Sequence, residues 1–270
     1  MKRFVFIISD GTGITAESLA NSLLSQFDNI RFDKQIIPYV DSIEKATELA
    51  NRINQYAEDY GQKPLVFMTF VNPEMNACMS ATNACVFDLF STFLAPLEQE
   101  LQTKSSYTVG RSHSVSNVKT YNHRMEAVEY TLNHDDGIKI RDYEQADIVL
   151  IGVSRCGKTP SCLYMALQFG ILAANYPFTD DELSDFRLPE ALRPFKGKLF
   201  GLTIDPERLQ HIRTERRPNS QYSSAEQCRL EISEVEAMYK LEHIPYINST
   251  RYSIEEIATK IMTMAGIKRR

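Results

Sequence analysis

Short apolar runs alternate with segments whose apolar residues recur every three or four positions over the first hundred residues. Apolar runs bounded by turn residues are typical of buried strands, and the longer period is typical of amphipathic helices. The pattern predicts strands at 4–9, 34–40 and 64–71, and helices at 14–27, 41–60 and 75–101, the last in one or two pieces. Strands that alternate with helices imply a mostly parallel sheet covered on both faces.

This periodicity fades between residues 103 and 122, where Ser, Thr, Asn, Gly and His dominate, and this composition favours a connection between two lobes. A helix at 124–132 follows and ends near Gly137. The alternation then resumes, with strands predicted at 146–151, 173–178, 198–204 and 245–248, and helices at 161–172, 223–241 and from Ser253 onward.

The predicted fold class is therefore α/β. It consists of an N-terminal βαβ-type lobe (1–102), a connector with a helix (103–137), and a C-terminal P-loop kinase-like lobe with a mostly parallel sheet (138–270).

Composition narrows the class of partner. The 270 residues are 43% hydrophobic and 24% charged, with 30 basic and 35 acidic side chains, so the net charge is −5. This balance gives no support to a nucleic-acid-binding or membrane-binding surface. The apolar run at 4–8 is too short for a signal peptide, and no run is long enough to span a bilayer. We expect a cytoplasmic protein with no nucleic-acid or membrane partner.

The five cysteines are odd in number and scattered, and none forms a C-x-x-C pair. This pattern favours free thiols in a reducing compartment over disulfides or a zinc site. Cys78 and Cys85 lie seven residues apart in a predicted helix, so we expect both on one buried face.

One stretch of the sequence predicts a phosphate-binding loop, because it fits the template G-x-x-x-x-G-K-[ST] at every fixed position. In such a loop the backbone N–H groups face phosphate oxygens, the Lys reaches the β- and γ-phosphates, and the Ser or Thr hydroxyl binds Mg²⁺. A predicted strand precedes it and a predicted helix follows, as the template requires. The eight residues are Gly152, Val153, Ser154, Arg155, Cys156, Gly157, Lys158 and Thr159.

Two acidic features have both a functional and an ordinary interpretation. Asp205 ends an apolar strand, where it could place Mg²⁺ beside the phosphates or could cap the next helix ahead of Pro206. Asp135 and Asp136 follow His134 in a dense polar cluster, which suits base catalysis or a solvated helix end. The spacing leaves these alternatives open.

Three arginines, Arg213, Arg216 and Arg217, precede a Pro-Asn-Ser turn. We expect them in a mobile loop, as a solvated basic run or as a clamp on phosphates.

Several strings together resemble the phosphoenolpyruvate synthase regulatory protein family of bacterial bifunctional kinases and pyrophosphorylases. They cover almost the whole chain, from the first strand to the last helix. The strings are Ile8-Ser9-Asp10-Gly11-Thr12, His134-Asp135-Asp136-Gly137, the phosphate loop with Pro160, Ala174-Asn175-Tyr176-Pro177, Gly201-Leu202-Thr203-Ile204-Asp205-Pro206-Glu207-Arg208, Ile247-Asn248-Ser249-Thr250 and Glu255-Glu256-Ile257-Ala258.

The resemblance implies an ADP-dependent serine/threonine kinase that inactivates phosphoenolpyruvate synthase by phosphorylating a threonine beside its catalytic histidine. It also implies reactivation by inorganic phosphate, which attacks the phosphothreonine and releases pyrophosphate. The cofactors implied are ADP, Mg²⁺ and, in the reverse direction, inorganic phosphate. The protein partner implied is phosphoenolpyruvate synthase, and a homo-oligomer is left open.

On this resemblance the nucleotide site maps onto Gly152 through Thr159. Lys158 and the loop amides would hold the β-phosphate of ADP, and Thr159 and Asp205 would place Mg²⁺. Asp205 or Asp136 would accept the proton, with Asp135 as a further candidate. The rival functions are a small-molecule kinase that uses ATP and a nucleotide-switched binding module, although no Asn-Lys-x-Asp guanine-reading string occurs.

Overall fold

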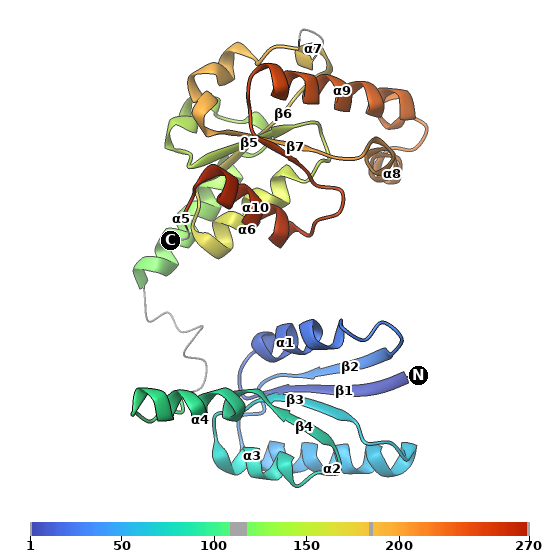
Figure 1. The fold of residues 1–270 in the computed structure, drawn as a ribbon, viewed down its shortest axis with the longest axis vertical. Helices are drawn as coiled ribbons and strands as arrows, with labels where there is room; N and C mark the ends of the chain where they lie inside the picture. The colour runs from blue at the N-terminus through green and yellow to red at the C-terminus, as the bar shows by residue number, and fades with distance from the viewer. Residues whose placement is uncertain (1, 109–117, 184–185, 269–270) are drawn as a thin grey trace. The chain divides into compact units, whose positions relative to one another are not determined.

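The computed structural model describes residues 2–108, 118–183 and 186–268. The chain divides into two compact units, Met1–Ser116 and Asn117–Arg270 (Figure 1). Each unit contains a four-stranded, all-parallel sheet with helices packed on it, which confirms the α/β class predicted from the sequence.

In the first unit the strands lie in the order β2-β1-β3-β4. One core cluster joins α2 and α3 to one face of the sheet, and a second joins α1 and α4 to the other face. The elements are β1 (Lys2–Ser9), α1 (Ile14–Leu24), β2 (Arg31–Ile37), α2 (Ile43–Tyr60), β3 (Leu65–Thr69), α3 (Pro73–Ser80), β4 (Cys85–Asp88) and α4 (Leu89–Leu101).

The edge strand β4 corrects the prediction of helix through 75–101. A turn at 81–84 separates α3 from the four-residue strand, and Cys85 pairs with Leu65 of β3. Asp88 then starts α4, because its side chain accepts a hydrogen bond from the N–H of Ser91. So short a strand lacks a readable alternation and forms because β3 offers it a free edge.

The cysteine prediction is therefore partly wrong. Cys78 lies half-buried on α3 and Cys85 lies exposed on β4, so they do not share a buried helix face. All five cysteines are free thiols, as predicted.

The second unit repeats the strand order, as β6-β5-β7-β8. Helices α5, α6 and α10 cover one face of this sheet and α9 covers the other, with α8 packed against α9 (Figure 1). The elements are α5 (Val118–Asn133), η2 (Asp135–Gly137), η3 (Ile140–Gln145), β5 (Ile148–Gly152), α6 (Lys158–Phe169), β6 (Ala173–Pro177), α7 (Asp180–Leu183), η4 (Glu190–Lys198), β7 (Leu199–Thr203), α8 (Pro206–Arg216), η5 (Gln221–Ser223), α9 (Ala225–Leu241), β8 (Tyr246–Asn248) and α10 (Ile254–Ala265), where η marks a 3₁₀ segment.

Helix α5 is part of the second unit. It packs against α6 and β6, with Ala127 fully buried and Tyr130 almost so. The lobe boundary predicted at residue 138 falls after this helix, whereas the compact unit begins at Asn117. Residues 109–117 of the predicted connector lie outside the described residues.

The strand order fixes where a ligand can bind in the second unit. From β5 the chain turns through α6 toward β6, whereas from β7 it turns through α8 toward β8 on the opposite side. Open parallel sheets bind ligands at the carboxyl ends of strands where the connections diverge in this way. In this unit that point lies between the ends of β5 and β7.

Among the helices that the structure describes, none combines the length and the apolar character needed to cross a bilayer.

Candidate functional site

The predicted phosphate loop joins β5 to α6 and begins with a glycine that no other residue can replace without strain. A Cβ on Gly152 would lie 2.5 Å from the carbonyl oxygen of Leu202 on β7. Further along, Arg155 (φ 77°) and Gly157 (φ 99°) adopt left-handed backbone conformations, and Gly157 caps the start of α6. The loop therefore turns sharply and leads directly into α6. The N–H groups of the first turn of that helix have no partner within the helix and can face an anion beside the loop.

The ammonium of Lys158 lies inside this loop. Its Nζ donates to the carbonyl oxygens of Gly152 (2.9 Å) and Val153 (2.8 Å), and the residue is 5% exposed. The Sγ atom of Cys156 lies 4.0 Å from Nζ, but burial raises the pKa of the Cys156 thiol, an effect that the nearby Lys158 charge only opposes in part. A protonated, buried thiol is a poor nucleophile, so Cys156 serves the packing of the loop.

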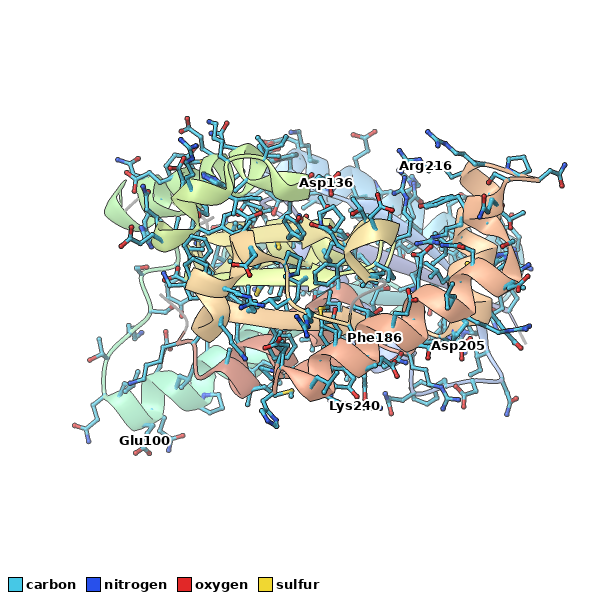
Figure 2. All side chains as sticks on the ribbon, turned by 90° about the horizontal axis from the view of Figure 1, so that it is seen from above. Glu100, Asp136, Phe186, Asp205, Arg216 and Lys240 are labelled. Atoms are coloured by element: carbon cyan, nitrogen blue, oxygen red, sulfur yellow. The ribbon has the colours of Figure 1, made fainter. Side chains whose placement is uncertain are left out.

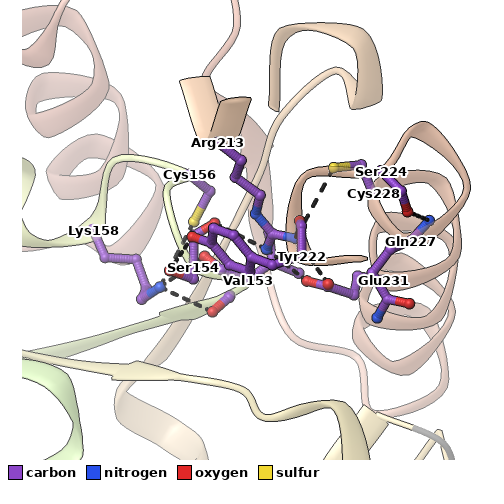
Figure 3. Close-up of polar contacts among 11 residues, drawn as sticks. Val153, Ser154, Cys156, Lys158, Arg213, Tyr222, Ser224, Gln227, Cys228 and Glu231 are labelled. Carbon is purple, nitrogen blue, oxygen red and sulfur yellow. Dashed lines mark hydrogen bonds and ion pairs between the residues drawn. The ribbon is translucent and has the colours of Figure 1, made fainter. Parts of the chain in front are cut away.

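Arg213 supports the loop from the side of α8, so the predicted position in a mobile loop, as a solvated basic run or as a phosphate clamp, is wrong for this residue. It lies in α8 with 1% of its surface exposed, and its Nη1 and Nη2 donate to the Glu231 carboxylate at 2.8 and 2.6 Å (Figure 3). Nη2 also donates to the carbonyl oxygen of Ser154 (3.2 Å), and the guanidinium lies 4.2 Å from the Tyr222 ring centroid. Its charge is thus used to join α8, α9 and the loop.

The neighbouring arginines differ from Arg213 in their surroundings. Arg216 lies in the last turn of α8 and lines the pocket beside the loop, whereas Arg217 is the C-cap residue of that helix. Of the three arginines, Arg216 is therefore the one whose position suits contact with a bound anion.

The acidic cluster lies on the other side of the loop, in η2. Thr159 Oγ1 donates to the Asp135 carboxylate (2.9 Å), which also accepts a hydrogen bond from the side-chain amide of Asn175. The N–H of Asp136 donates to Asn175 Oδ1 (3.0 Å). Asp135 is thereby bound to the first turn of α6, while Asp136 follows it in a left-handed conformation (φ 52°).

A pocket of about 250 Å³ brings most of the predicted residues together. Three cationic side chains and one carboxylate line it, so it suits an anion such as a phosphate group. Asp136 and Arg216 lie along one side of the unit in Figure 2, and Asp205 along the other. The lining residues are Asp136, Ser154, Arg155, Gly157, Lys158, Thr159, Pro160, Pro177, Ile212 and Arg216.

Asp205 is not among the residues that line this pocket. Its Oδ1 accepts hydrogen bonds from the N–H groups of Glu207 (2.9 Å) and Arg208 (3.3 Å), with Pro206 at the first helical position of α8. The capping interpretation of Asp205 is therefore confirmed, and its role toward Mg²⁺ stays a prediction.

A metal ion at this site would share its ligands with a nucleotide. In the described part of the chain no three His, Cys, Asp or Glu side chains are grouped to hold a metal. Mg²⁺ bound beside phosphates needs only one or two protein oxygens, however. The hydroxyl of Thr159 and the carboxylate of Asp135, 2.9 Å apart at the start of α6, fit that requirement.

Asn175 is the residue of this cluster to which the sequence analysis assigned no role. It is fully buried in β6, between Ala174 and Tyr176, and bonds both acids of η2. A buried polar side chain in an apolar strand is the signal that could have identified it, because such a group needs partners.

The family model described as kinase/pyrophosphorylase matches residues 5–262 of the chain. A relative from Legionella pneumophila (strain Corby) is 67% identical over 270 residues, which is 100% of both chains. Relatives from Hahella chejuensis and Pseudomonas fluorescens (strain Pf0-1) are each 56% identical over 100% of this chain and 99% of their own. All three carry the provisional name phosphoenolpyruvate synthase regulatory protein.

The ion pair behind the loop gives a stability prediction. Glu231→Gln keeps the shape of the side chain but leaves the Arg213 guanidinium buried without a counter-charge. Breaking a buried pair in this way typically costs about 3–5 kcal/mol. We expect the free energy of unfolding, measured by urea titration of circular dichroism, to fall by that amount.

A matched control is Glu242→Gln, which breaks the pair between Lys196 and Glu242 (2.6 Å), with the lysine side chain 48% exposed. Exposed pairs contribute at most about 1 kcal/mol, so this variant should unfold almost as the wild type does. An equal fall in the free energy of unfolding in the two variants would show that the buried Arg213 pair stabilises the fold no more than an exposed pair does.

Proposed function

The chain belongs to the kinase/pyrophosphorylase family, and from this premise we propose that it is a bifunctional regulator of phosphoenolpyruvate synthase. It would phosphorylate a threonine of that enzyme with ADP and remove the phosphate with inorganic phosphate. The observation that carries the proposal is the shared pocket, in which the Lys158 loop and the Asp136 side chain face the same space. A phosphate group and a proton acceptor are both needed there for phosphoryl transfer.

The forward reaction needs an in-line arrangement more than it needs covalent help. The loop amides and Lys158 would hold the β-phosphate of ADP. The target threonine oxygen attacks the β-phosphorus and passes its proton to Asp136. The bond from that phosphorus to the oxygen that bridges to the α-phosphate breaks, and AMP leaves.

The reverse reaction would use the same pocket. An oxygen of inorganic phosphate attacks the phosphorus of the phosphothreonine and forms pyrophosphate. Asp136 takes the proton of the attacking phosphate hydroxyl, the bond from phosphorus to the threonine oxygen breaks, and Asp136 passes that proton to the threonine oxygen. The two reactions have different co-substrates, but both pass a phosphoryl group to or from the same threonine oxygen, so one loop could hold that group in both.

Three acids compete for the role of base, and their contacts favour Asp136. The carboxylate of Asp205 is engaged by two helix N–H groups, and that of Asp135 by Thr159 and Asn175. For the Asp136 carboxylate, no hydrogen-bond or ion-pair partner is found among the described residues, and this residue lines the pocket. A base must be able to reach the proton that it removes.

Mg²⁺, when bound, would neutralise part of the phosphate charge. Thr159 would hold it together with the phosphates and one carboxylate, which is Asp205 in the sequence-based prediction and Asp135 on the contacts of Thr159.

The proposed function can be tested by comparing ADP and ATP as phosphoryl donors. If the loop binds a diphosphate whose terminal group is transferred, the additional γ-phosphate of ATP would move the reacting phosphorus out of line. Purified protein should therefore phosphorylate phosphoenolpyruvate synthase with ATP-free ADP and not with ATP, as measured by mass spectrometry of the modified threonine. Efficient transfer from ATP alone would instead favour the small-molecule or conventional kinase.

Lys158 should be essential in both directions. Loss of one electrostatic contact to a transition state costs about 3–4 kcal/mol, roughly a hundred- to a thousandfold in rate. We expect Lys158→Ala to lose phosphorylation and phosphorolysis alike while it keeps a native circular dichroism spectrum. The control is Lys240→Ala, which changes an exposed lysine in the last turn of α9 and should keep both rates. A near-normal rate in either direction for Lys158→Ala would exclude a shared site.

Kinetic measurements can distinguish the role of Asp136 from that of Asp205. Asp136→Asn should keep the affinity for ADP and Mg²⁺ but lose turnover, because the damage falls on the transition state alone. If Asp205 is a Mg²⁺ ligand, Asp205→Asn should shift the Mg²⁺ titration to higher concentration with partial rescue. Full activity of Asp205→Asn at low Mg²⁺ would show that this acid acts only as a helix cap.

A further inference from the structure

The side chain of Asn175 is a fully buried polar group in the central part of β6, where its backbone pairs with Leu150 of β5. Burying an amide without partners is unfavourable, so each of its hydrogen-bonding groups should be satisfied. Its side chain has hydrogen-bond partners in the segment between α5 and β5 and in the first turn of α6. They include both acids of the candidate site.

Asn175 binds three consecutive residues of that segment. Its backbone N–H donates to the carbonyl oxygen of His134 (3.3 Å), its Oδ1 accepts from the N–H of Asp136 (3.0 Å), and its Nδ2 donates to the carboxylate of Asp135. The Tyr143 hydroxyl in turn donates to the backbone oxygen of Asn175 (2.8 Å). A single buried residue thus fastens the acidic turn to the sheet.

The chemistry of these partners fixes the orientation of the amide. The N–H of Asp136 requires an acceptor, whereas the Asp135 oxygen that faces Asn175 requires a donor. Asn carries one of each at a fixed spacing. An aspartate at this position could satisfy the N–H but would set a second negative charge against Asp135.

This arrangement gives the two adjacent acids different surroundings. Asp135 is held toward Thr159, while Asp136, with φ 52° and ψ 37°, lines the pocket with Lys158. Left-handed conformations are accessible to Asp but need a restraint to be the single populated state. The hydrogen bond from its own N–H to Asn175 is such a restraint.

We propose that Asn175 is a positioning residue that holds Asp136 in the pocket and Asp135 on Thr159. The inference rests on the proposed function, in which Asp136 is the base. Asn175 itself does not line the pocket and acts through the two acids.

The central experiment exchanges the donor and the acceptor. Asn175→Asp is nearly isosteric but replaces the amide donor by a carboxylate. Because misplacing a reacting group costs up to about a hundredfold, kcat should fall about ten- to a hundredfold, with KM for ADP changed less than about threefold.

The double variant Asp135→Asn/Asn175→Asp restores a donor and an acceptor between positions 135 and 175 and reverses the direction of the contact with Thr159. The amide introduced at position 135 donates to the carboxylate introduced at position 175, which still accepts from the N–H of Asp136. Thr159 and Asn175 donate to the same oxygen of Asp135, so the new amide nitrogen takes the place of that oxygen and the Thr159 hydroxyl accepts its second proton.

Because Asp135 is also a candidate ligand of Mg²⁺, the coupling is measured by hydrogen exchange of the acidic turn and not by kcat. The double variant should lose most of the increase in exchange that Asn175→Asp shows, a coupling that independent sites do not show. Exchange in the double variant as fast as in Asn175→Asp would overturn the proposal.

A second readout does not depend on turnover. Hydrogen exchange of peptides that cover residues 134–143, followed by mass spectrometry, should be faster in Asn175→Asp and in Asn175→Ala and return toward the wild-type rate in the double variant. The alanine variant tests the loss of the amide without an added charge. Unchanged exchange in both single variants would overturn the proposal even if phosphoenolpyruvate synthase is not the substrate.

The matched control is Asn248→Asp at the exposed end of β8. The side-chain oxygen of Asn248 accepts from the N–H of Thr250 (2.9 Å), a bond that aspartate keeps. This variant should match the wild type in kcat and in exchange. A wild-type protein that does not transfer phosphate from ADP would refute the proposed function, whereas the exchange rates still decide the role of Asn175.

Discussion

The candidate site depends on the close approach of the ends of β5 and β7, where Gly152 lies against the carbonyl of Leu202. A Cβ at Gly152 would come within 2.5 Å of that oxygen, so any side chain would force the strands apart. The hydroxyl of Tyr239 on α9 reinforces this contact, because it lies 2.9 Å from the carbonyl oxygen of Ile151 and 3.3 Å from that of Leu202. The ring of Tyr239 also packs on Gly201. A Cβ on Gly201 would lie 2.6 Å from that ring. The loop starts from a rigid, close-packed point.

From that point the loop is held on three sides by residues far away in the sequence. Arg213 of α8 reaches the carbonyl of Ser154, and Ser249, which follows β8, donates to the carbonyl of Cys156 (2.9 Å). Asp135 holds Thr159 at the start of α6. These contacts use backbone oxygens or the hydroxyl of the loop and none of its N–H groups. Preorganised donors of this kind stabilise transferring charge without reorganisation.

How much of this could be predicted from the sequence depends on how local each interaction is. The phosphate loop consists of eight consecutive residues, so its template and its strand-loop-helix context were readable, as was the capping option for Asp205 and Pro206. Arg213 was misplaced because its partner Glu231 is 18 residues away on another helix. Asn175 was missed because the acids that it holds are 39 and 40 residues distant. The edge strand β4 was missed because β3 supplies its pairing.

The two units show that topology locates the site but does not supply its chemistry. Both sheets have the same strand order, and in both a glycine with left-handed φ, Gly13 or Gly157, caps the helix after the first strand. The first helical position that follows is Ile14 in one unit, 57% exposed, and the buried Lys158 in the other. The first loop also contains Asp10, which accepts from the N–H of Val71 (2.8 Å) and whose pKa is raised by burial. A repeated frame therefore presents a carboxylate in one loop and an ammonium in the other. Phosphate chemistry follows these side chains and not the fold that they share.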